Sequence, residues 1–171
     1  MSFTTTRIGG RYLRIVDWHW RDPLDATFAA RPPGQRWNPP GLRCLYLNAD
    51  IATARANVMS RFADRPLSID EVDPASAPHL VEIEVPNGTA ADAFTQSGLT
   101  LLGLPASYPH EADGTIVPHS KCQPIGQAAF DAGHNGVDCR SAATHGGREL
   151  AWFPDTGTAR LVSRKPQPQW W

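Results

Sequence analysis

Residues 35–47 read Gln35-Arg36-Trp37-Asn38-Pro39-Pro40-Gly41-Leu42-Arg43-Cys44-Leu45-Tyr46-Leu47. The two prolines exclude a helix and hold the chain in an extended or turned path, and Gly41 then permits a tight turn. The apolar run that follows predicts a buried strand. Because the guanidinium of Arg36 offers a planar set of donors that suits phosphate, this rigid loop is a candidate site for an anionic ligand. The aromatic faces of Trp37 and Tyr46 could hold a ring.

The same residues also have an ordinary structural interpretation. A loop arginine is usually solvated, a tryptophan usually packs in a core, and Asn-Pro-Pro usually forms a turn. The stretch therefore indicates a binding function only in combination with the rest of the chain.

Composition limits the class of protein. The 171 residues are enough for one domain with a core, and 41% hydrophobic with 19% charged residues is typical of a globular protein. The net charge of −1 gives no basic footprint for direct nucleic-acid binding, and no apolar run reaches the length of a membrane span. The N-terminus lacks the apolar centre of a signal peptide. Three cysteines without a Cys-x-x-Cys pair fit reduced thiols in the cytoplasm.

The hydrophobic pattern predicts strands interspersed with helices, without a regular βαβ alternation. This order favours an α+β fold, with a mixed β-sheet core and flanking helices. We expect a single domain over residues 1–171, with a core at about 12–163 and a C-terminal tail at 164–171. The two tryptophans that end the tail either fold back on the domain or meet a partner. The predicted strands are 12–16, 45–48, 79–85 and 136–140, with a closing hairpin of 149–153 and 159–163. The predicted helices are 51–62, capped by Asp50, then 89–96, and 120–132, capped by Ser120, with a long excursion at 98–118.

Several motifs with known chemistry are absent from the sequence. There is no phosphate-binding glycine loop, no dinucleotide fingerprint and no zinc-protease motif, and the scattered histidines predict no metal site. Ser120 lies at the predicted start of a helix, where backbone N–H groups favour an anion. Its hydroxyl has the alternative role of simply capping that helix.

A family resemblance is carried by three groups of residues: Arg36-Trp37-Asn38-Pro39-Pro40, Leu45-Tyr46-Leu47, and Ser120-x-Cys122-Gln123 with Gly126 and the later Gly136-Val137. Over roughly residues 12–162 the chain resembles the RES-domain family. The resemblance implies a fold similar to that of ADP-ribosyltransferase toxins. It also implies a cytoplasmic toxin of a bacterial type II toxin–antitoxin pair, with an Xre-type antitoxin as protein partner. NAD would be the substrate, degraded by phosphorolysis or hydrolysis, and no bound cofactor is expected. One branch of the family instead transfers ADP-ribose to a protein. A homodimer and a toxin–antitoxin hetero-oligomer both remain open.

The resemblance also implies roles for single residues. Arg36 takes the place of the family arginine, and Arg14 that of a second arginine which lines the pocket. Tyr46 matches the aromatic residue beside the nicotinamide, and Ser120 matches the family serine. The expected catalytic residues are Arg36, Tyr46, Asn57 and Ser120, and the expected NAD-binding residues are Arg14, Arg36, Trp37, Asn38, Tyr46 and Ser120.

The sequence departs from the family at Asn57, where the family glutamate is expected. Breaking the nicotinamide–ribose bond builds positive charge on the ribose, and a carboxylate stabilises that charge better than an amide does. Losing such an interaction commonly costs about 3 kcal/mol, or roughly a hundredfold in rate. Glu82, Glu84 or Glu149 could replace it, although Glu82 and Glu84 are better explained as a solvated strand face. Alternatively Asn57 holds ribose hydroxyls, or catalysis is lost and the chain only binds NAD or an antitoxin. If Asn57 stands in for the glutamate, Asn57→Glu should raise NAD turnover about ten- to a hundredfold.

Overall fold

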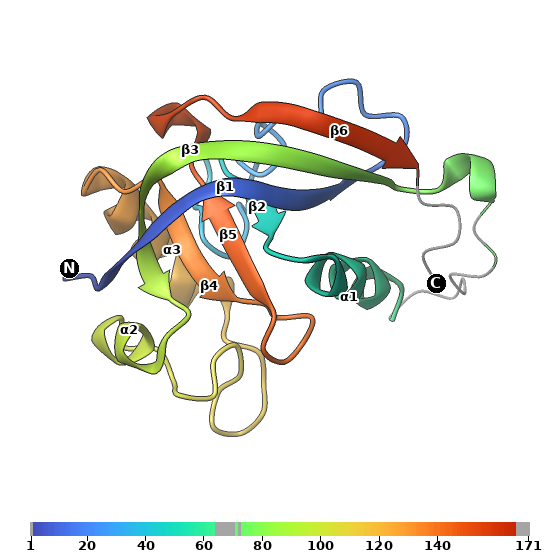
Figure 1. The fold of residues 1–171 in the computed structure, drawn as a ribbon. Coiled ribbons are helices and arrows are strands. Elements are labelled where there is room, and N and C mark those ends of the chain that lie inside the picture. Colours follow the sequence, from blue (N-terminus) through green and yellow to red (C-terminus); the bar gives the residue numbers. More distant parts are fainter. Residues whose placement is uncertain (1, 64–70, 72, 167–171) are drawn as a thin grey trace.

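The computed structural model describes residues 2–63, 71 and 73–166. Within these residues a six-stranded sheet and three α-helices form an α+β fold (Figure 1), as the sequence predicts. The strands are β1 (Thr5–Val16), β2 (Leu45–Asn48), β3 (His79–Ala93), β4 (Gly136–Arg140), β5 (Arg148–Trp152) and β6 (Arg160–Pro166). The helices are α1 (Ile51–Phe62), α2 (Gln96–Leu101) and α3 (His119–Asp131), with short 3-10 helices at Pro74–Ser76 and Pro154–Thr156.

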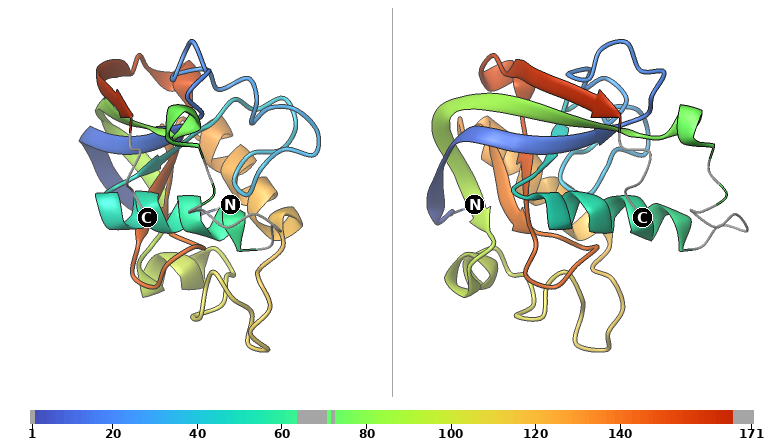
Figure 2. Two further views of the ribbon diagram at one scale, coloured as in Figure 1. Left: turned by 90° about the vertical axis from the view of Figure 1, so that its right-hand side faces the viewer. Right: turned by 45° about the vertical axis from the view of Figure 1, so that its right-hand side comes forward.

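The sheet is mixed and strongly curved. Its strand order is β1-β2-β5-β4-β3-β6, and an additional pairing of β1 with β3 closes the first five strands on themselves and leaves β6 at the edge. Only the β3–β4 pairing is parallel among the strands of the described chain. Figures 1 and 2 show β1, β3 and β6 running side by side as an upper layer, with β2, β5 and β4 beneath them.

The core lies on both sides of the lower strands. Between the two layers pack side chains that alternate along the strands: Ile8, Val16, Leu45, Leu47, Val81, Ile83, Val85, Leu150 and Trp152. The opposite face of β2, β5 and β4 packs against α3 and the loops before it, with Trp37, Cys44, Cys122, Cys139 and Phe153 among the buried residues. Because successive side chains of a strand point to opposite faces, β2, β4 and β5 can contribute to the packing on both of their faces.

The local predictions are confirmed in four elements, α1, β2, β3 and β4. The bounds of α1, β2 and β4 are those predicted, and Asp50 caps α1 by accepting a hydrogen bond from Thr53 N at 2.7 Å. In β3 the valine and isoleucine residues at 81, 83 and 85 are buried, whereas Glu82 and Glu84 are only partly covered. The apolar residues of β3 therefore point inward and the two glutamates outward, as predicted.

Where the bounds of an element differ from those predicted, the cause is pairing with a strand that is distant in the sequence. The segment predicted as a helix over 89–96 is the end of β3, and α2 begins only at Gln96. Ala90, Ala91 and Ala93 are fully buried, and this part of β3 pairs with β4, which outweighs the helix propensity of alanine. β1 likewise begins at Thr5, seven residues before the predicted strand, because it pairs with β3 along this length.

The predicted closing hairpin is wrong. β5 pairs with β2 on one side and with β4 on the other, so neither of its edges is available to β6. β6 instead pairs with β3. It continues to Pro166, beyond the predicted start of the C-terminal tail, and Trp170 and Trp171 lie outside the described residues.

The predicted capping role of Ser120 is also wrong. α3 begins at His119 after Pro118, no side chain caps it, and Ser120 is exposed in its first turn. The excursion before α3 is confirmed from residue 102 to 118, where the chain forms neither helix nor strand apart from the isolated bridge between His110 and Ile116. No helix in the described part of the chain is long and apolar enough to cross a membrane.

Candidate functional site

The Arg-Trp-Asn loop is built around Asn38. Its side-chain amide donates to Ala29 O at 2.7 Å and to Leu42 O at 3.0 Å, and its Oδ1 accepts from the Tyr46 hydroxyl at 2.9 Å. The same hydroxyl accepts from Trp37 N at 2.8 Å. Asn38 and Trp37 are buried, at 0% and 1% exposure. They therefore fix the shape of the loop from inside the protein, and neither lines the cavity described below.

α3 packs directly on this loop. Gln123 Nε2 donates to Pro33 O and Gln35 O at 3.0 and 3.1 Å. A Cβ added to Gly126 would lie 1.6 Å from the carbonyl oxygen of Trp37, so only glycine allows this approach. The Arg-Trp-Asn loop and the α3 residues Gln123 and Gly126, both parts of the family motif, thus form one packed unit.

A cavity of about 570 Å³ opens beside this unit, between β1, β2, β5 and α1. Three residues expected from the sequence line it, namely Arg14, Tyr46 and Asn57, together with the suspected acid Glu149. Gln35, Cys44, Asn48, Arg61 and the aromatic residues Trp20 and Phe28 also line it. Its volume lies within the range of small-molecule sites, about 300–1,000 Å³.

Arg14 provides a positive charge in this cavity. Its guanidinium donates to Pro23 O and lies 5.5 Å from the centre of the Trp20 ring. Burial lowers the pKa of Arg14 to about 10, the like charge of Arg61 acts in the same direction, and the carboxylate of Asp25 opposes it. Arg14 remains protonated at neutral pH, so the cavity favours an anionic group of a ligand.

Tyr46 and Cys44 contribute neutral groups. Burial raises the pKa of the Tyr46 hydroxyl well above its usual value, and burial also raises the pKa of the Cys44 thiol. A protonated thiol is a poor nucleophile, which disfavours Cys44 in that role. With its hydroxyl held by Trp37 and Asn38, Tyr46 can offer its ring to a ligand.

Asn57 and Glu149 are in direct contact. Asn57 Nδ2 donates to Glu149 Oε1 and to Asn48 Oδ1, both at 2.8 Å. Asn48 is itself fixed by a hydrogen bond from its Nδ2 to Leu13 O at 3.1 Å. The residue at the expected glutamate position therefore binds a glutamate that comes from another element.

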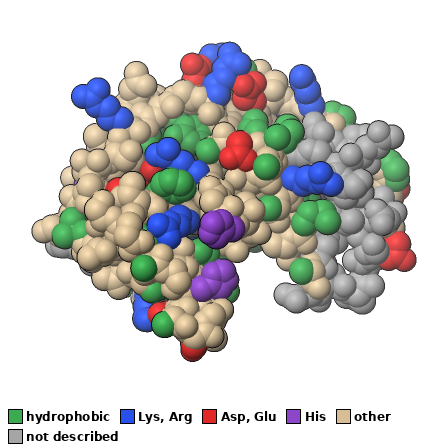
Figure 3. All heavy atoms as spheres, turned by 60° about the horizontal axis from the view of Figure 1, so that its bottom comes forward, with side chains coloured by type: hydrophobic (Ala, Val, Ile, Leu, Met, Phe, Trp, Pro, Cys, Tyr) green, Lys and Arg blue, Asp and Glu red, His purple; other side chains and the backbone are tan. Residues whose placement is uncertain are grey.

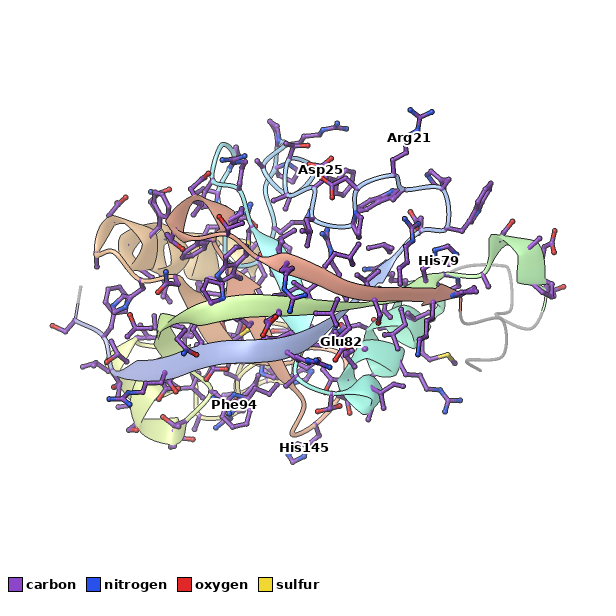
Figure 4. All side chains as sticks on the ribbon, turned by 45° about the horizontal axis from the view of Figure 1, so that its top comes forward. Arg21, Asp25, His79, Glu82, Phe94 and His145 are labelled. Atoms are coloured by element: carbon purple, nitrogen blue, oxygen red, sulfur yellow. The ribbon has the colours of Figure 1, made fainter. Side chains whose placement is uncertain are left out.

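The other suspected acids are not in the cavity. Glu82 forms an ion pair with Arg11 at 3.0 Å, and Glu84 pairs with Arg160, on the β1–β3–β6 layer where Figure 4 labels Glu82. The interpretation of both residues as an exposed strand face is confirmed.

Arg36 and Ser120 lie outside the lining of the cavity, at the start of α3. Arg36 Nη1 donates to Val117 O at 2.8 Å. Burial lowers the pKa of His119, and the positive charge of Arg36 adds to this effect. Gln35, which precedes Arg36, does line the cavity, so the two parts of the expected site are joined along the chain.

Sequence reasoning missed Arg61, Asn48, Trp20 and Phe28. Arg61 could have been found, because it lies one helical turn after Asn57 on α1. Arg55, the other arginine of α1, is exposed and does not line the cavity. Trp20 and Phe28 lie in a loop without periodicity, and their rings are 6.1 Å apart.

A second cavity, of about 800 Å³, contains none of the expected residues. It lies between the loops 105–110 and 140–146, on the side of the molecule where Figure 4 labels Phe94 and His145. Figure 3 shows basic and histidine side chains gathered on the face made by these lower loops. Arg140, which lines this cavity, donates to Phe94 O at 2.8 Å and to Ala106 O at 2.9 Å. The guanidinium of Arg140 therefore holds these loops in place. Because the first cavity contains expected residues and the second contains none, the first is the candidate functional site.

The fold and the first cavity define a class of protein: an α+β domain with a cavity lined by arginines, aromatic rings and a carboxylate that accepts a hydrogen bond from an amide. The profile of the RES domain matches residues 11–171. The chain belongs to the RES-domain family, as its motifs predicted.

Among solved structures, the chain is similar over nearly its whole length to a chain in the crystal structure of the M. tuberculosis MbcT–MbcA toxin–antitoxin complex. The TM-score is 0.76 at 23% sequence identity, over 96% of this chain and 87% of that one. At this identity the similarity establishes the fold. No curated protein matches the sequence.

Proposed function

We propose that the protein is a cytoplasmic toxin that degrades NAD by cleaving its nicotinamide–ribose bond. The observation that carries the proposal is the cavity itself. In a RES-domain fold it brings together Arg14, Tyr46, Asn57 and Glu149, which come from four different elements.

The charges of the cavity suit a dinucleotide. Arg14 and Arg61 can bind the pyrophosphate, since a guanidinium gives two parallel hydrogen bonds to phosphate oxygens. Tyr46, Trp20 and Phe28 supply aromatic faces on which the rings of NAD can stack.

The start of α3 is proposed as the neighbouring anion site. Arg36 and Ser120 are both at this helix N-terminus, whose backbone N–H groups favour negative charge. Here they would bind an attacking phosphate, or the part of the NAD pyrophosphate that extends beyond the cavity. Trp37 and Asn38 would act indirectly, by holding Arg36 and Tyr46 in place.

The reaction transfers the ribose carbon C1′ from nicotinamide to an oxygen. The C1′–N bond breaks, its electron pair leaves with nicotinamide, and a new bond forms from C1′ to phosphate or to water. A protein side chain as acceptor would make the same cavity an ADP-ribosyltransferase.

An antitoxin partner is proposed on the strength of the fold. The similar chain comes from a toxin–antitoxin complex, which supports a partner protein that binds this chain and keeps it inactive. We expect that partner to be of the Xre type.

The test is incubation of the purified protein with NAD in phosphate buffer. Nicotinamide with ADP-ribose-1-phosphate would support phosphorolysis, and nicotinamide with free ADP-ribose would support hydrolysis. ADP-ribose attached to a protein would identify a transferase. NAD binding without any release of nicotinamide would show that the chain is a binding module, and the proposal would then be wrong.

A further inference from the structure

The carboxylate of Glu149 lines the cavity, and the proposed chemistry leaves it without an assigned role. Glu149 lies on β5, opposite Asn48 of β2 and Cys139 of β4, so all three side chains share one face of the sheet. This face contributes to the cavity, and Glu149 lies in its lining together with Asn48 and Asn57. We propose that Glu149 is the catalytic carboxylate of this protein, and that Asn57 positions it. The inference rests on the proposed function.

The hydrogen bond from Asn57 holds the Glu149 carboxylate in place without placing a positive charge beside it. Asn57 uses the two N–H groups of one amide for Glu149 Oε1 and Asn48 Oδ1, and Asn48 is anchored to the backbone of β1. The orientation of both amides is therefore determined, and so is the direction of the carboxylate. Among the described residues Glu149 forms no ion pair.

Asp138 shows, by contrast, what an ion pair does to a carboxylate. Asp138, on β4, is buried and receives two hydrogen bonds from Arg148, at 2.7 and 2.6 Å. Its negative charge is thus taken up by a fixed cation. A carboxylate held by one neutral amide, that of Asn57, keeps its negative charge for the transient positive charge that develops on the ribose during bond cleavage.

The chemistry of the reaction requires such a charge. As the C1′–N bond breaks, positive charge develops on the ribose, and an adjacent carboxylate stabilises it. When water is the acceptor, the carboxylate can also take the proton that water loses as its oxygen bonds to C1′, and then release it to solvent. When phosphate is the acceptor, its oxygen already carries the negative charge, and stabilisation of the ribose is sufficient.

The same geometry explains an uncharged residue at 57. A second carboxylate on α1 would lie within hydrogen-bonding distance of Glu149, where two like charges repel. An amide at this position instead donates to the carboxylate. The structure therefore assigns the negative charge to strand β5 and the donor to helix α1.

The test compares nicotinamide release and NAD binding in matched variants. Glu149→Gln keeps the shape and the oxygen that accepts from Asn57 but removes the charge. We expect kcat to fall about a hundredfold while the Kd for NAD stays nearly unchanged. Glu84→Gln removes a carboxylate from the outer face of the sheet and should behave as the parent does.

Two further variants separate a chemical role from a structural one. Glu149→Ala leaves room for a small carboxylate, so added formate should restore part of its kcat, whereas Glu149→Gln, whose side chain fills the same space, should not respond. Asn57→Ala should lower kcat about tenfold with little change in KM, because the carboxylate is present but no longer held.

Equal turnover of Glu149→Gln and the parent would overturn the assignment while leaving the NAD-cleaving function intact. Failure of formate to restore any activity to a folded Glu149→Ala protein would also overturn it. A parent protein that releases no nicotinamide would overturn the proposed function itself, and this inference with it.

Discussion

The contact between Asn57 and Glu149 can be tested without any assay of function, through the substitution Asn57→Asp. The replacement has the same shape, but it exchanges the amide group that donates to Glu149 Oε1 and Asn48 Oδ1, at 2.8 Å each, for a second acceptor. Two hydrogen bonds, each worth about 1 kcal/mol, are lost. Two carboxylates about 4 Å apart near a protein surface repel by up to about 4 kcal/mol, and less where water screens them.

We therefore expect the free energy of unfolding at pH 8 to fall by about 3 kcal/mol. For a chain of this length that lowers Tm by roughly 6–12 °C. Because the folded variant binds a proton more tightly than the unfolded chain does, its stability falls as pH rises. The difference from the parent should accordingly narrow when unfolding is measured at pH 5.

The double variant Asn57→Asp with Glu149→Gln reverses donor and acceptor and should recover most of the stability. This corresponds to a coupling free energy of about 2 kcal/mol in a double-mutant cycle. Ala52→Asp adds the same charge at an exposed position of α1 and should change stability by less than about 0.5 kcal/mol. If Asn57→Asp melts like the parent at both pH values, the two side chains do not touch and the proposed support of Glu149 is wrong.

This contact also changes the result expected for Asn57→Glu. From the sequence alone the added carboxylate should raise turnover, because the position then lacks an acid. In the structure an acid is already hydrogen-bonded to Asn57. We now expect NAD turnover to stay level or to fall, since the two carboxylates compete for one site.

Three further predictions concern other parts of the structure. Gly126→Ala should lower Tm, because the clash of a Cβ only 1.6 Å from Trp37 O outweighs the gain of about 1 kcal/mol in helix propensity. Gln127→Ala, on the same helix, should leave Tm unchanged. If Gly126→Ala also left Tm unchanged, α3 would not pack on the loop. Burial raises the pKa of Asp92, but hydrogen bonds from Thr95 and Phe94 lower it by more, so the pKa lies below its usual value. That carboxylate stabilises the fold above pH 4 and loses this effect as pH falls, so Asp92→Asn should cost stability at pH 7 and progressively less in urea titrations towards pH 3. Arg36→Lys keeps the charge but loses the planar donors, so the KM for NAD should rise; turnover and binding equal to those of the parent would show that Arg36 does not bind phosphate.

Local chemistry in the sequence accounts for several elements with their bounds. Asp50 followed by a run with helical periodicity gives α1, and a short apolar run after two prolines gives β2. These signals work because capping, proline geometry and side-chain periodicity act within a few residues. The Arg-Trp-Asn motif is similarly local: Asn38, Tyr46 and Trp37 form one hydrogen-bonded unit within ten residues.

The pairing of distant strands has no such local signal. Residues 89–93 carry helix-forming alanines, yet they form a strand because β4 lies beside them. β6 follows β5 in the chain but pairs with β3, because both edges of β5 are already occupied. The site depends on the same pairings. Asn57 and Glu149 are 92 positions apart, and they meet because β5 lies next to β2, with α1 following β2 directly. The sequence could name both residues, but their contact arises from the order of strands in the sheet.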